Sequence, residues 1–428
     1  MKLFYFSHVK RASIIIFIVA FSFPLTVRAQ TKSLIDYFPD IKITDSNGPE
    51  PGYFFVSSKT LESASDTFYL AIFDNYGTPL FFRLMPGLCT GFTVQPNGFL
   101  TYTFGKPRKI FMMDSLYQVV DTVVTEGYKI DPHGYYVTAD GHALLFGNKR
   151  RTVDMSAIVE GGDPAATIRD KVVQEFDESG NLLYTWKFWE HYEITDANEN
   201  SPFVDLTAST IDYAHPNDIT TDSDTSFLIS NRHMDEVTKV DRRTGDIIWR
   251  LGGENNGFTF VDDSFHFSHQ HSISILSNGN LLLFDNGNLH DPSFSSTVEY
   301  QLDEVNKTAT LITRIRRVPN VFSEHSGCTQ RLPNGNTLIG WGPFVPSATE
   351  FFPDGSRAIE IDFSNHSFSN PITKFPWKQK VFETNKDSVD FGMWDGYTES
   401  FYLLNITNNL TSAISITSYS TNTEHFSI

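Results

Sequence analysis

The chain has 428 residues, of which 40% are hydrophobic and 14% aromatic, so it is long enough for one large domain or two to three ordinary ones. Its formal net charge is −18 at pH 7, and no basic stripe interrupts this acidic balance. Nucleic acid and anionic membrane surfaces are therefore excluded as expected partners, and an anionic substrate would need a local concentration of positive charge.

The first 29 residues have the pattern of a secretory signal peptide. Lys2, Lys10 and Arg11 precede the apolar run ASIIIFIVAFSFPL, and VRA before Gln30 resembles a cleavage site. Because this segment carries four positive residues and no acidic ones, its removal would change the formal charge from −18 to −22. No later stretch is apolar enough to span a membrane. We therefore expect an exported protein, in the periplasm, on the cell surface or secreted, that does not span the membrane.

A repeat of two apolar runs joined by a turn follows from about residue 50. Four of the turns carry a glycine at the same place, namely Gly98, Gly141, Gly279 and Gly335. The residues eight positions earlier are Thr90, His133, His271 and Gly327. His215 takes the same position ahead of the turn at 222–224, which lacks the glycine. Internal repeats of this kind indicate an architecture built from similar units.

Each unit continues with a second hairpin, for example VVQEFDESGNLLYTW, VTKVDRRTGDIIW or ATEFFPDGSRAIEID. Four strands per unit, with spacings of 43 to 82 residues between units, predict an all-β fold: a six-bladed β-propeller with a short C-terminal β extension. The longest spacing holds AIVEGGDPAATIRD and EHYEITDANENSP, which we expect to form insertions or short helices. The expected divisions are a signal peptide (1–29), an N-terminal segment (30–50), the propeller (51–365) and a β-rich extension (366–428).

The repeat predicts that three histidines meet at one place. The first strand of each blade lines the central channel of a propeller, so His133, His215 and His271 would converge from three adjacent blades. A single histidine at the start of a strand more often caps a local turn, but three at one register favour a site. Arg232 ends the second strand of the His215 unit, and antiparallel pairing would return it to the same region.

This set of residue types favours an anion site. A guanidinium presents a planar fork of donors that fits a tetrahedral oxyanion. Asn217 lies two residues after His215 on the same strand face, where it would fix the tautomer of that imidazole, or it is simply a turn residue beside Pro216. Three histidines also suit zinc, but a second cation beside Arg232 is unfavourable, so we expect no metal and no cofactor.

Group transfer is the chemistry that the pattern favours. Neutral imidazole is a competent nucleophile near neutral pH, and transfer of a sulfuryl or phosphoryl group depends mainly on positioning and on charge stabilisation. The paired carboxylates of a glycosidase are not seen, because Asp218 and Asp285 do not repeat in register. The G-x-S-x-G elbow of many serine hydrolases is absent from the sequence.

Two segments carry a family resemblance: HPNDI…FLISNRHMDEVTKVDRRTGDIIWRLGG and FHFSHQHSISILSNGNLLLFDNGN. Over about 130–345 the chain resembles the bacterial aryl-sulfate sulfotransferase family. That resemblance implies a six-bladed propeller outside the cytoplasm, which moves a sulfuryl group from a phenolic sulfate ester donor to a phenolic acceptor. The implied reaction passes through a sulfated histidine and uses no nucleotide donor.

The resemblance also implies a role for each matched residue. His271 would be the nucleophile, and His133 and His215 would bind the sulfuryl oxygens and assist proton transfer. Arg232 would clamp the sulfate, and Asn217 would orient His215. His271, His215, His133 and Arg232 are thus the expected catalytic residues.

Other interpretations stay open at this point. The family places a hydroxyl residue near the strand of the last blade, and Ser326 is the candidate for substrate binding there. A non-catalytic exported propeller that binds a partner or glycan is the alternative function. TGDIIW also suits a quinoprotein-type propeller, but it occurs cleanly once rather than in every unit. Cys89 and Cys328 are either free buried thiols or, in an oxidising compartment, a disulfide.

Overall fold

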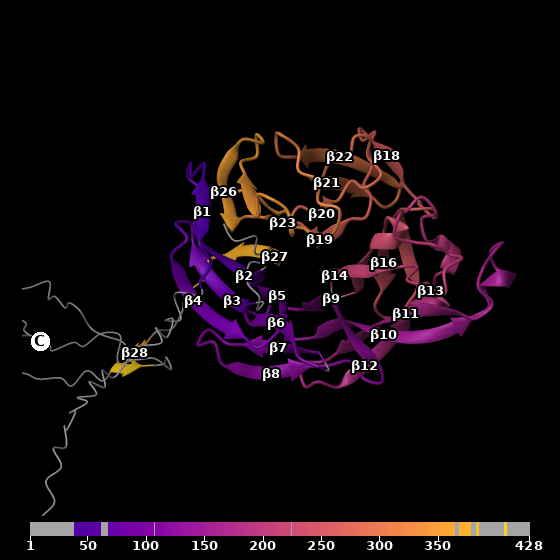
Figure 1. The fold of residues 1–428 in the computed structure, drawn as a ribbon, viewed down its shortest axis with the longest axis horizontal. Coiled ribbons are helices and arrows are strands. Elements are labelled where there is room, and N and C mark those ends of the chain that lie inside the picture. Colours follow the sequence, from indigo (N-terminus) through magenta and orange to yellow (C-terminus); the bar gives the residue numbers. More distant parts are fainter. Residues whose placement is uncertain are drawn as a thin grey trace, which may run out of the picture. The chain divides into compact units, whose positions relative to one another are not determined.

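The computed structural model describes residues 38–60, 67–106, 108–223, 225–363, 368–377, 382–384 and 406–408. Six small sheets follow one another around a ring (Figure 1), which confirms the six-bladed β-propeller. The expected signal peptide lies outside the described residues. Within them, helices are single 3₁₀ turns, and none has the length and apolar character needed to cross a membrane.

Each of the six blades has four principal strands, ordered here from the central channel outward. Blade 1 contains β27 (Phe368–Phe375), β2 (Tyr53–Thr60), β3 (Thr67–Asp74) and β4 (Pro79–Met85). Blade 2 contains β5 (Thr90–Val94), β6 (Leu100–Phe104), β7 (Lys109–Met113) and β8 (Val119–Val123). Blade 3 contains β9 (Lys129–Val137), β10 (Ala143–Val153), β11 (Ala166–Phe176) and β12 (Leu182–Lys187).

Blade 4 contains β14 (Pro216–Ser223), β15 (Ser226–Asn231), β16 (Glu236–Asp241) and β17 (Ile247–Gly252). Blade 5 contains β19 (His271–Ile275), β20 (Leu281–Asp285), β21 (Ser296–Asp303) and β22 (Thr308–Ile315). Blade 6 contains β23 (Cys328–Arg331), β24 (Thr337–Gly340), β25 (Ala348–Phe351) and β26 (Arg357–Phe363). The short strands β1 (Ile41–Thr44), β13 (Thr210–Ile211) and β18 (Thr259–Val261) pair with β26, β11 and β22.

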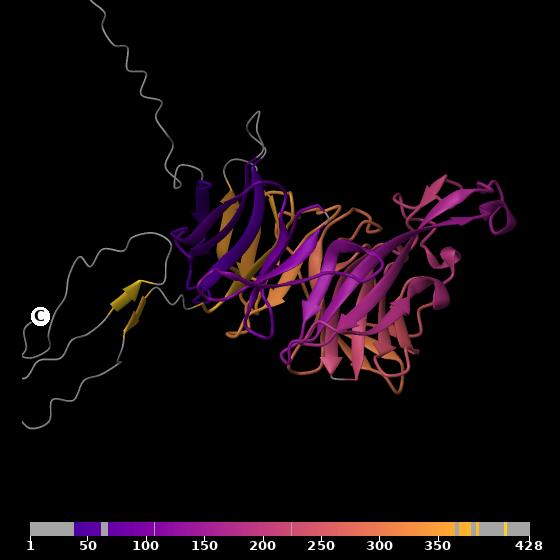
Figure 2. The same ribbon diagram turned by 90° about the horizontal axis from the view of Figure 1, so that it is seen from below.

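The expected insertions lie in blades 3 and 4. Strands β10 and β11 form a long hairpin, drawn purple to magenta in Figure 2, that extends beyond the other strands. The 3₁₀ turn η2 (Met155–Ala157) lies at its tip. Two further turns, η3 (Phe188–Glu190) and η4 (Ile194–Asp196), follow β12. A fourth, η5 (Arg232–Met234), follows β15 directly.

The predicted repeat register agrees with the inner strands of blades 2 to 6. Thr90 and His271 begin β5 and β19. His215 and Gly327 come directly before β14 and β23, and His133 lies within β9. Four of the five equivalent positions therefore lie at the starts of strands and His133 lies inside its strand, and these strands neighbour one another around the channel.

The ends of the ring differ from the expected boundaries. Strand β27 lies beyond the expected propeller (51–365), yet it pairs with β2 as the inner strand of blade 1. Strand β1 lies in the expected N-terminal segment (30–50), yet it pairs with the outer edge of blade 6. Building one blade from both ends of the chain closes the ring and covers the inner edge of β2. Within the expected extension (366–428), β28 (Phe382–Thr384) and β29 (Ile406–Asn408) pair with each other.

A second position of the repeat holds neighbouring blades together. In blades 3, 5 and 6 the residue directly after the turn glycine binds a carboxylate on the third strand of its own blade, as His142 does with Glu175, Asn280 with Glu299, and Asn336 with Glu350. Each carboxylate also binds a cation of the next blade, and these cations are Arg242, Arg331 and Lys374 respectively. We call Glu175, Glu299 and Glu350 the inter-blade carboxylates. The pair Lys374–Glu350, at 2.8 Å, is fully buried where the ring closes.

Apolar side chains fill the spaces between adjacent blades. Phe146 of blade 3 packs in one cluster with Phe227 of blade 4, and Phe284 of blade 5 packs in another with Trp341 of blade 6. Both cysteines are free and buried, each in a different one of these inter-blade clusters. The propeller is therefore stabilised by burial between its sheets rather than by a bond between the two thiols.

Candidate active site

The structure brings five of the six sequence-predicted residues, all except Asn217, to one pocket of about 630 Å³. His133, His215, His271, Arg232 and Ser326 all line it. The other lining residues are Arg169, Phe203, Thr210, Asp212, His233 and His325. Residues from four blades thus share one cavity, as the repeat register predicts.

β-Bulges at the starts of the inner strands direct these side chains. In β19, Ser272 and Ile273 together face a single residue of β20, so the ladder shifts directly after His271. In β9 the irregularity is larger, because the four residues 131–134 lie opposite one residue of β10. His215 and Ser326 have left-handed backbones, with φ of 45° and 62°. Bulges and left-handed non-glycine residues concentrate at functional sites, where they redirect side chains.

Hydrogen bonds determine the tautomer of His271. Its Nδ1 lies 2.7 Å from Oδ1 of Asn286 and 3.1 Å from the backbone oxygen of His269, and both of these atoms are acceptors. The amide of Asn286 is oriented by its own Nδ2, which donates to the backbone oxygens of Ser323 and Ser326 at 2.7 and 2.9 Å. Nδ1 of His271 therefore carries the proton, which leaves the lone pair on Nε2.

The surroundings keep His271 uncharged. Burial, the largest cause, lowers its pKa well below the usual range, and the positive charge of Arg232 acts in the same direction. The nearby imidazoles of His215 and His133 also lower this pKa, whereas the hydrogen bond to Asn286 opposes the shift. At neutral pH this side chain is a neutral imidazole with an available lone pair, which is the reactive form of a histidine nucleophile.

Two aspartates hold the other histidines of the ring. Nδ1 of His215 donates to Asp212 at 2.9 Å, and Nδ1 of His133 donates to Asp131, so both imidazoles keep Nε2 free of these bonds. Their ring centroids are 4.8 Å apart. Lys171 lies behind them, 2.7 Å from Asp131 and 3.9 Å from Asp212. Burial on its own would raise the pKa of each carboxyl, but the histidine and lysine partners outweigh it, so both pKa values lie below the usual range.

Arg232 is held by contacts on several sides. Its two terminal nitrogens donate to Nε2 of His233 at 2.9 Å and to the backbone oxygen of Glu324 at 3.1 Å. The guanidinium also lies 4.2 Å from the ring centre of Phe203. Burial lowers the pKa of Arg232 to about 10, so the side chain stays positive at neutral pH. This positioned cation beside the neutral imidazole of His271 suits the stabilisation of an oxyanion.

The structure corrects one predicted contact. Asn217 was expected to orient His215, but its Nδ2 donates to the backbone oxygen of Gln270 at 2.7 Å. Asn217 is the extra residue of the bulge in β14, and its side chain therefore binds the neighbouring blade. Asp212 makes the contact to His215 that was assigned to Asn217.

A metal ion fits this cluster poorly. Asp212, His215 and His233 offer ligand atoms within 4.8 Å of one another. However, Nε2 of His233 accepts from Arg232, and its Nδ1 donates to the backbone oxygen of Asp212 at 2.5 Å. Nδ1 of His215 is also bonded to Asp212. Since these nitrogens already have partners, and Arg232 adds a positive charge, a metal ion would have to displace internal hydrogen bonds next to a cation.

Sequence reasoning missed the residues that support the ring. Asp131 and Asp212 occur in the similar segments KIDPH and TIDYAH, two and three residues before their histidines, and this shared I-D-x-H-like spacing was a usable signal. Asn286 follows the second strand of its blade in FDNGN, and no local pattern identifies its partner. His233, which stacks on His215 with ring centroids 4.5 Å apart, had only its proximity to Arg232 to mark it.

Comparison with solved structures finds matches of low similarity. A protein of unknown function from Bacteroides caccae is 14% identical with a TM-score of 0.45, over 73% of this chain and 93% of that one. The Pseudomonas aeruginosa periplasmic gluconolactonase PpgL is 11% identical with a TM-score of 0.42, over 77% and 100% of the two chains.

Sequence comparison is more specific. The arylsulfate sulfotransferase AssT of Escherichia coli O6:H1 (strain CFT073) is 24% identical over 345 residues, with 65% of this chain covered. The match spans 56% of that relative's length, little more than half. The family model described as arylsulfotransferase (ASST) matches residues 101–364, which include the histidines, Arg232 and Ser326. The chain belongs to the arylsulfotransferase family.

Proposed function

We propose that this protein transfers a sulfuryl group from a phenolic sulfate ester to a phenolic acceptor, through a sulfated His271. The observation that carries the proposal is the tautomer of His271: two acceptors hold the proton on Nδ1, and the lone pair on Nε2 belongs to a neutral imidazole. Arg232, His133 and His215 line the same pocket, where the guanidinium supplies donors for sulfuryl oxygens and an imidazole does so when its Nε2 is also protonated. A non-catalytic scaffold has no need of this arrangement.

In the first half-reaction, Nε2 of His271 attacks the sulfur of the donor. The N–S bond forms while the S–O bond to the aryl group breaks, and the phenolate leaves with the bonding electron pair. Charge on the sulfuryl oxygens is stabilised by Arg232 and by whichever of His133 and His215 carries a second proton. That protonated imidazole then supplies a proton to the departing phenolate.

In the second half-reaction, the hydroxyl oxygen of the acceptor attacks the sulfur. The N–S bond breaks, its electron pair returns to Nε2 of His271, and the new aryl S–O bond forms. His133 or His215 accepts the proton of the acceptor hydroxyl, which restores the starting state. Asp131 and Asp212 orient these two bases and stabilise their protonated forms. Ser326 lines this pocket and would contact the substrate, whereas Asn217 does not line it.

Rapid-mixing kinetics with 4-nitrophenyl sulfate test the proposal. Without acceptor, we expect a burst of nitrophenolate approaching one equivalent per site, and with phenol we expect ping-pong kinetics. His271→Ala should abolish the burst, and mass spectrometry after alkaline quenching should find a sulfuryl increment on the peptide that contains His271. No adduct, or an adduct on another residue, would remove His271 from this role. The mechanism uses no metal, so activity should survive EDTA.

We also propose that the protein works outside the cytoplasm. The support is the charge and apolar pattern of residues 1–29 and the VRA sequence before Gln30. N-terminal sequencing of protein recovered from the producing cell tests this. A mature chain that begins near residue 30, outside the cytoplasmic fraction, agrees with the proposal, and a cytoplasmic chain that begins at Met1 contradicts it.

A further inference from the structure

A second pocket next to the histidines has an unusual charge. Its volume is about 820 Å³, and blades 2, 3 and 4 contribute to its lining. Six cationic side chains line it, namely Arg108, Lys129, Lys149, Arg150, Arg169 and Lys171. The only carboxylates in the lining are those of Asp131 and Asp212. In a chain with a net charge of −18, this is the local concentration of positive charge that an anionic ligand requires.

Two of the six cations offset the carboxylates. Lys171 is 2.7 Å from Asp131, and Arg169 is 3.6 Å from Asp212. The other four, Arg108, Lys129, Lys149 and Arg150, form no ion pair with any residue that the structure describes. Their charge is therefore not used to hold the fold.

The next residue in the run, Arg151, provides the contrast. It bonds to Asp170 at 2.9 Å and its guanidinium lies 4.4 Å from the ring centre of Trp189, so it has a structural role. Lys149 and Arg150 lie on the same strand, β10, and instead line the open pocket. The strand thus separates a cation that supports the fold from cations available to a ligand.

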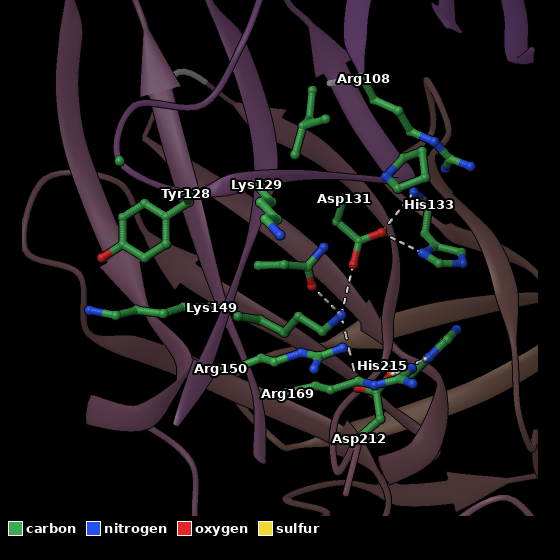
Figure 3. Close-up of a pocket in the computed structure, with 15 residues that line it drawn as sticks. Arg108, Tyr128, Lys129, Asp131, His133, Lys149, Arg150, Arg169, Asp212 and His215 are labelled. Atoms are coloured by element: carbon green, nitrogen blue, oxygen red, sulfur yellow. Dashed lines mark hydrogen bonds and ion pairs between the residues drawn. The ribbon is translucent and has the colours of Figure 1, made fainter. Parts of the chain in front are cut away.

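This cationic pocket is continuous with the candidate active site. His133, His215, Arg169 and Asp212 line both pockets. Figure 3 shows His133 and His215 at one end of the cationic pocket, with Tyr128 and Lys149 at the other. A molecule held at His271 can therefore extend past the two histidines and reach the four uncompensated cations.

We propose that the cationic pocket binds a second anionic group, such as a carboxylate or sulfate, on the aromatic substrate whose sulfuryl or hydroxyl group lies at His271. Tyr128, Ile130 and Pro132 supply an apolar surface for the intervening ring. Lysine and arginine side chains supply the donors that a carboxylate or sulfate accepts. This inference rests on the proposed sulfuryl transfer and names the class of aromatic compound that the site prefers.

The double variant Lys149→Glu/Arg150→Glu tests this proposal. The measured quantity is the ratio of kcat/KM for an anionic substrate to kcat/KM for its uncharged analogue. In the acceptor arm, 4-nitrophenyl sulfate is the donor, and 3-(4-hydroxyphenyl)propanoate is compared with its methyl ester. In the donor arm, phenol is the acceptor, and 2-carboxy-4-nitrophenyl sulfate is compared with 4-nitrophenyl sulfate. We expect the anionic-to-uncharged ratio to fall about tenfold in the arm that uses the pocket, because charge-assisted contacts are replaced by repulsion.

Arg243→Glu is the matched control, since it reverses an exposed charge on the β16–β17 turn, outside both pockets. Its ratios should equal those of the wild type. Ratios that stay within twofold of wild type in both arms of the double variant would overturn the proposal. If the double variant does not fold, Lys149→Gln/Arg150→Gln replaces it.

Binding separates failure of this inference from failure of the proposed function. If the wild-type protein transfers no sulfuryl group, calorimetry compares 3-(4-hydroxyphenyl)propanoate with its methyl ester. If the carboxylate binds more tightly than its ester, and the double variant loses this preference, the pocket is supported although the transfer reaction fails. Equal binding of the two compounds contradicts the pocket.

Discussion

Histidines lie at both ends of the inner strands but have different contacts at each end. At the start of these strands His133, His215 and His271 face a shared pocket, and their hydrogen bonds leave Nε2 available. At the far end, one residue past the turn glycine, His142 binds an inter-blade carboxylate, Glu175, which Arg242 of the next blade also contacts. A histidine in this fold thus lines the shared pocket or supports the contact between blades according to its position in the repeat.

The largest effect that we expect comes from His271→Ala. Loss of the nucleophile should lower kcat/KM by about 10⁴ or more, because covalent catalysis cannot proceed without it. His142→Ala, the same substitution at the other end of a repeat, should leave kcat/KM within about twofold and lower the free energy of unfolding by roughly 1 kcal/mol. Steady-state kinetics and urea unfolding measure both. Equal losses of activity in the two variants would contradict the division of roles.

Lys374→Met should give the largest loss of stability. Removal of one partner from a fully buried ion pair leaves Glu350 uncompensated and costs about 3–5 kcal/mol. Urea unfolding monitored by tryptophan fluorescence measures this, while the activity per folded molecule should stay close to wild type. The double variant Glu350→Leu/Lys374→Met should recover part of the loss. A single variant as stable as wild type would mean that this pair does not hold the closure.

Asp212→Asn should lower kcat/KM by about 10²-fold, less than the loss of His271. The amide replaces the acceptor of Nδ1 with a group that also donates, so the tautomer and the basicity of His215 change. Asp212 is a positioning residue, so Asp212→Glu should restore part of the rate and the pH profile of kcat/KM should shift in the asparagine variant. An unchanged pH profile with a lower thermal stability would indicate a purely structural role.

Acid should weaken the fold through the buried histidines. Burial lowers the pKa of His233 to about 3, below the value of about 6.5 for an unfolded chain. The unfolded state therefore binds the proton first, and the free energy of unfolding falls as the pH drops below about 6.5. We expect a loss of up to about 1.4 kcal/mol per pH unit from this residue between pH 6 and 4. Urea unfolding at several pH values should show a smaller slope for His233→Phe than for wild type.

The features that could be predicted from the sequence are those determined by the repeat. Turn glycines and apolar runs set the register, and the register predicted that His133, His215 and His271 would share a cavity with Arg232. Contacts between blades are a different matter, because they join residues far apart in the chain. The bond between Asn217 and Gln270 spans 53 residues and follows from a bulge that no local pattern reveals.

Strand β27, which closes the ring, is a second feature that the sequence repeat does not predict. Strand β27 is not followed by a turn glycine such as those after β5, β9, β19 and β23, so the repeat does not include it. Its place is determined by the unpaired edge of β2 and by the buried contact of Lys374 with Glu350. Tertiary pairing of this kind decides the structure where local sequence signals are weak.

The closure by β27 has a consequence for the order in which the protein is assembled. Strand β2 (53–60) can pair with the inner strand of blade 1 only after residues 368–375 have been synthesised. More than three hundred residues are made between these two strands of one sheet. A chain that stops before residue 368 would keep five blades with all four principal strands and leave the β2 edge open for pairing with another molecule. Blade 1 is therefore the first blade to begin and the last to be completed, so closure of the ring requires a chain that extends through residue 375.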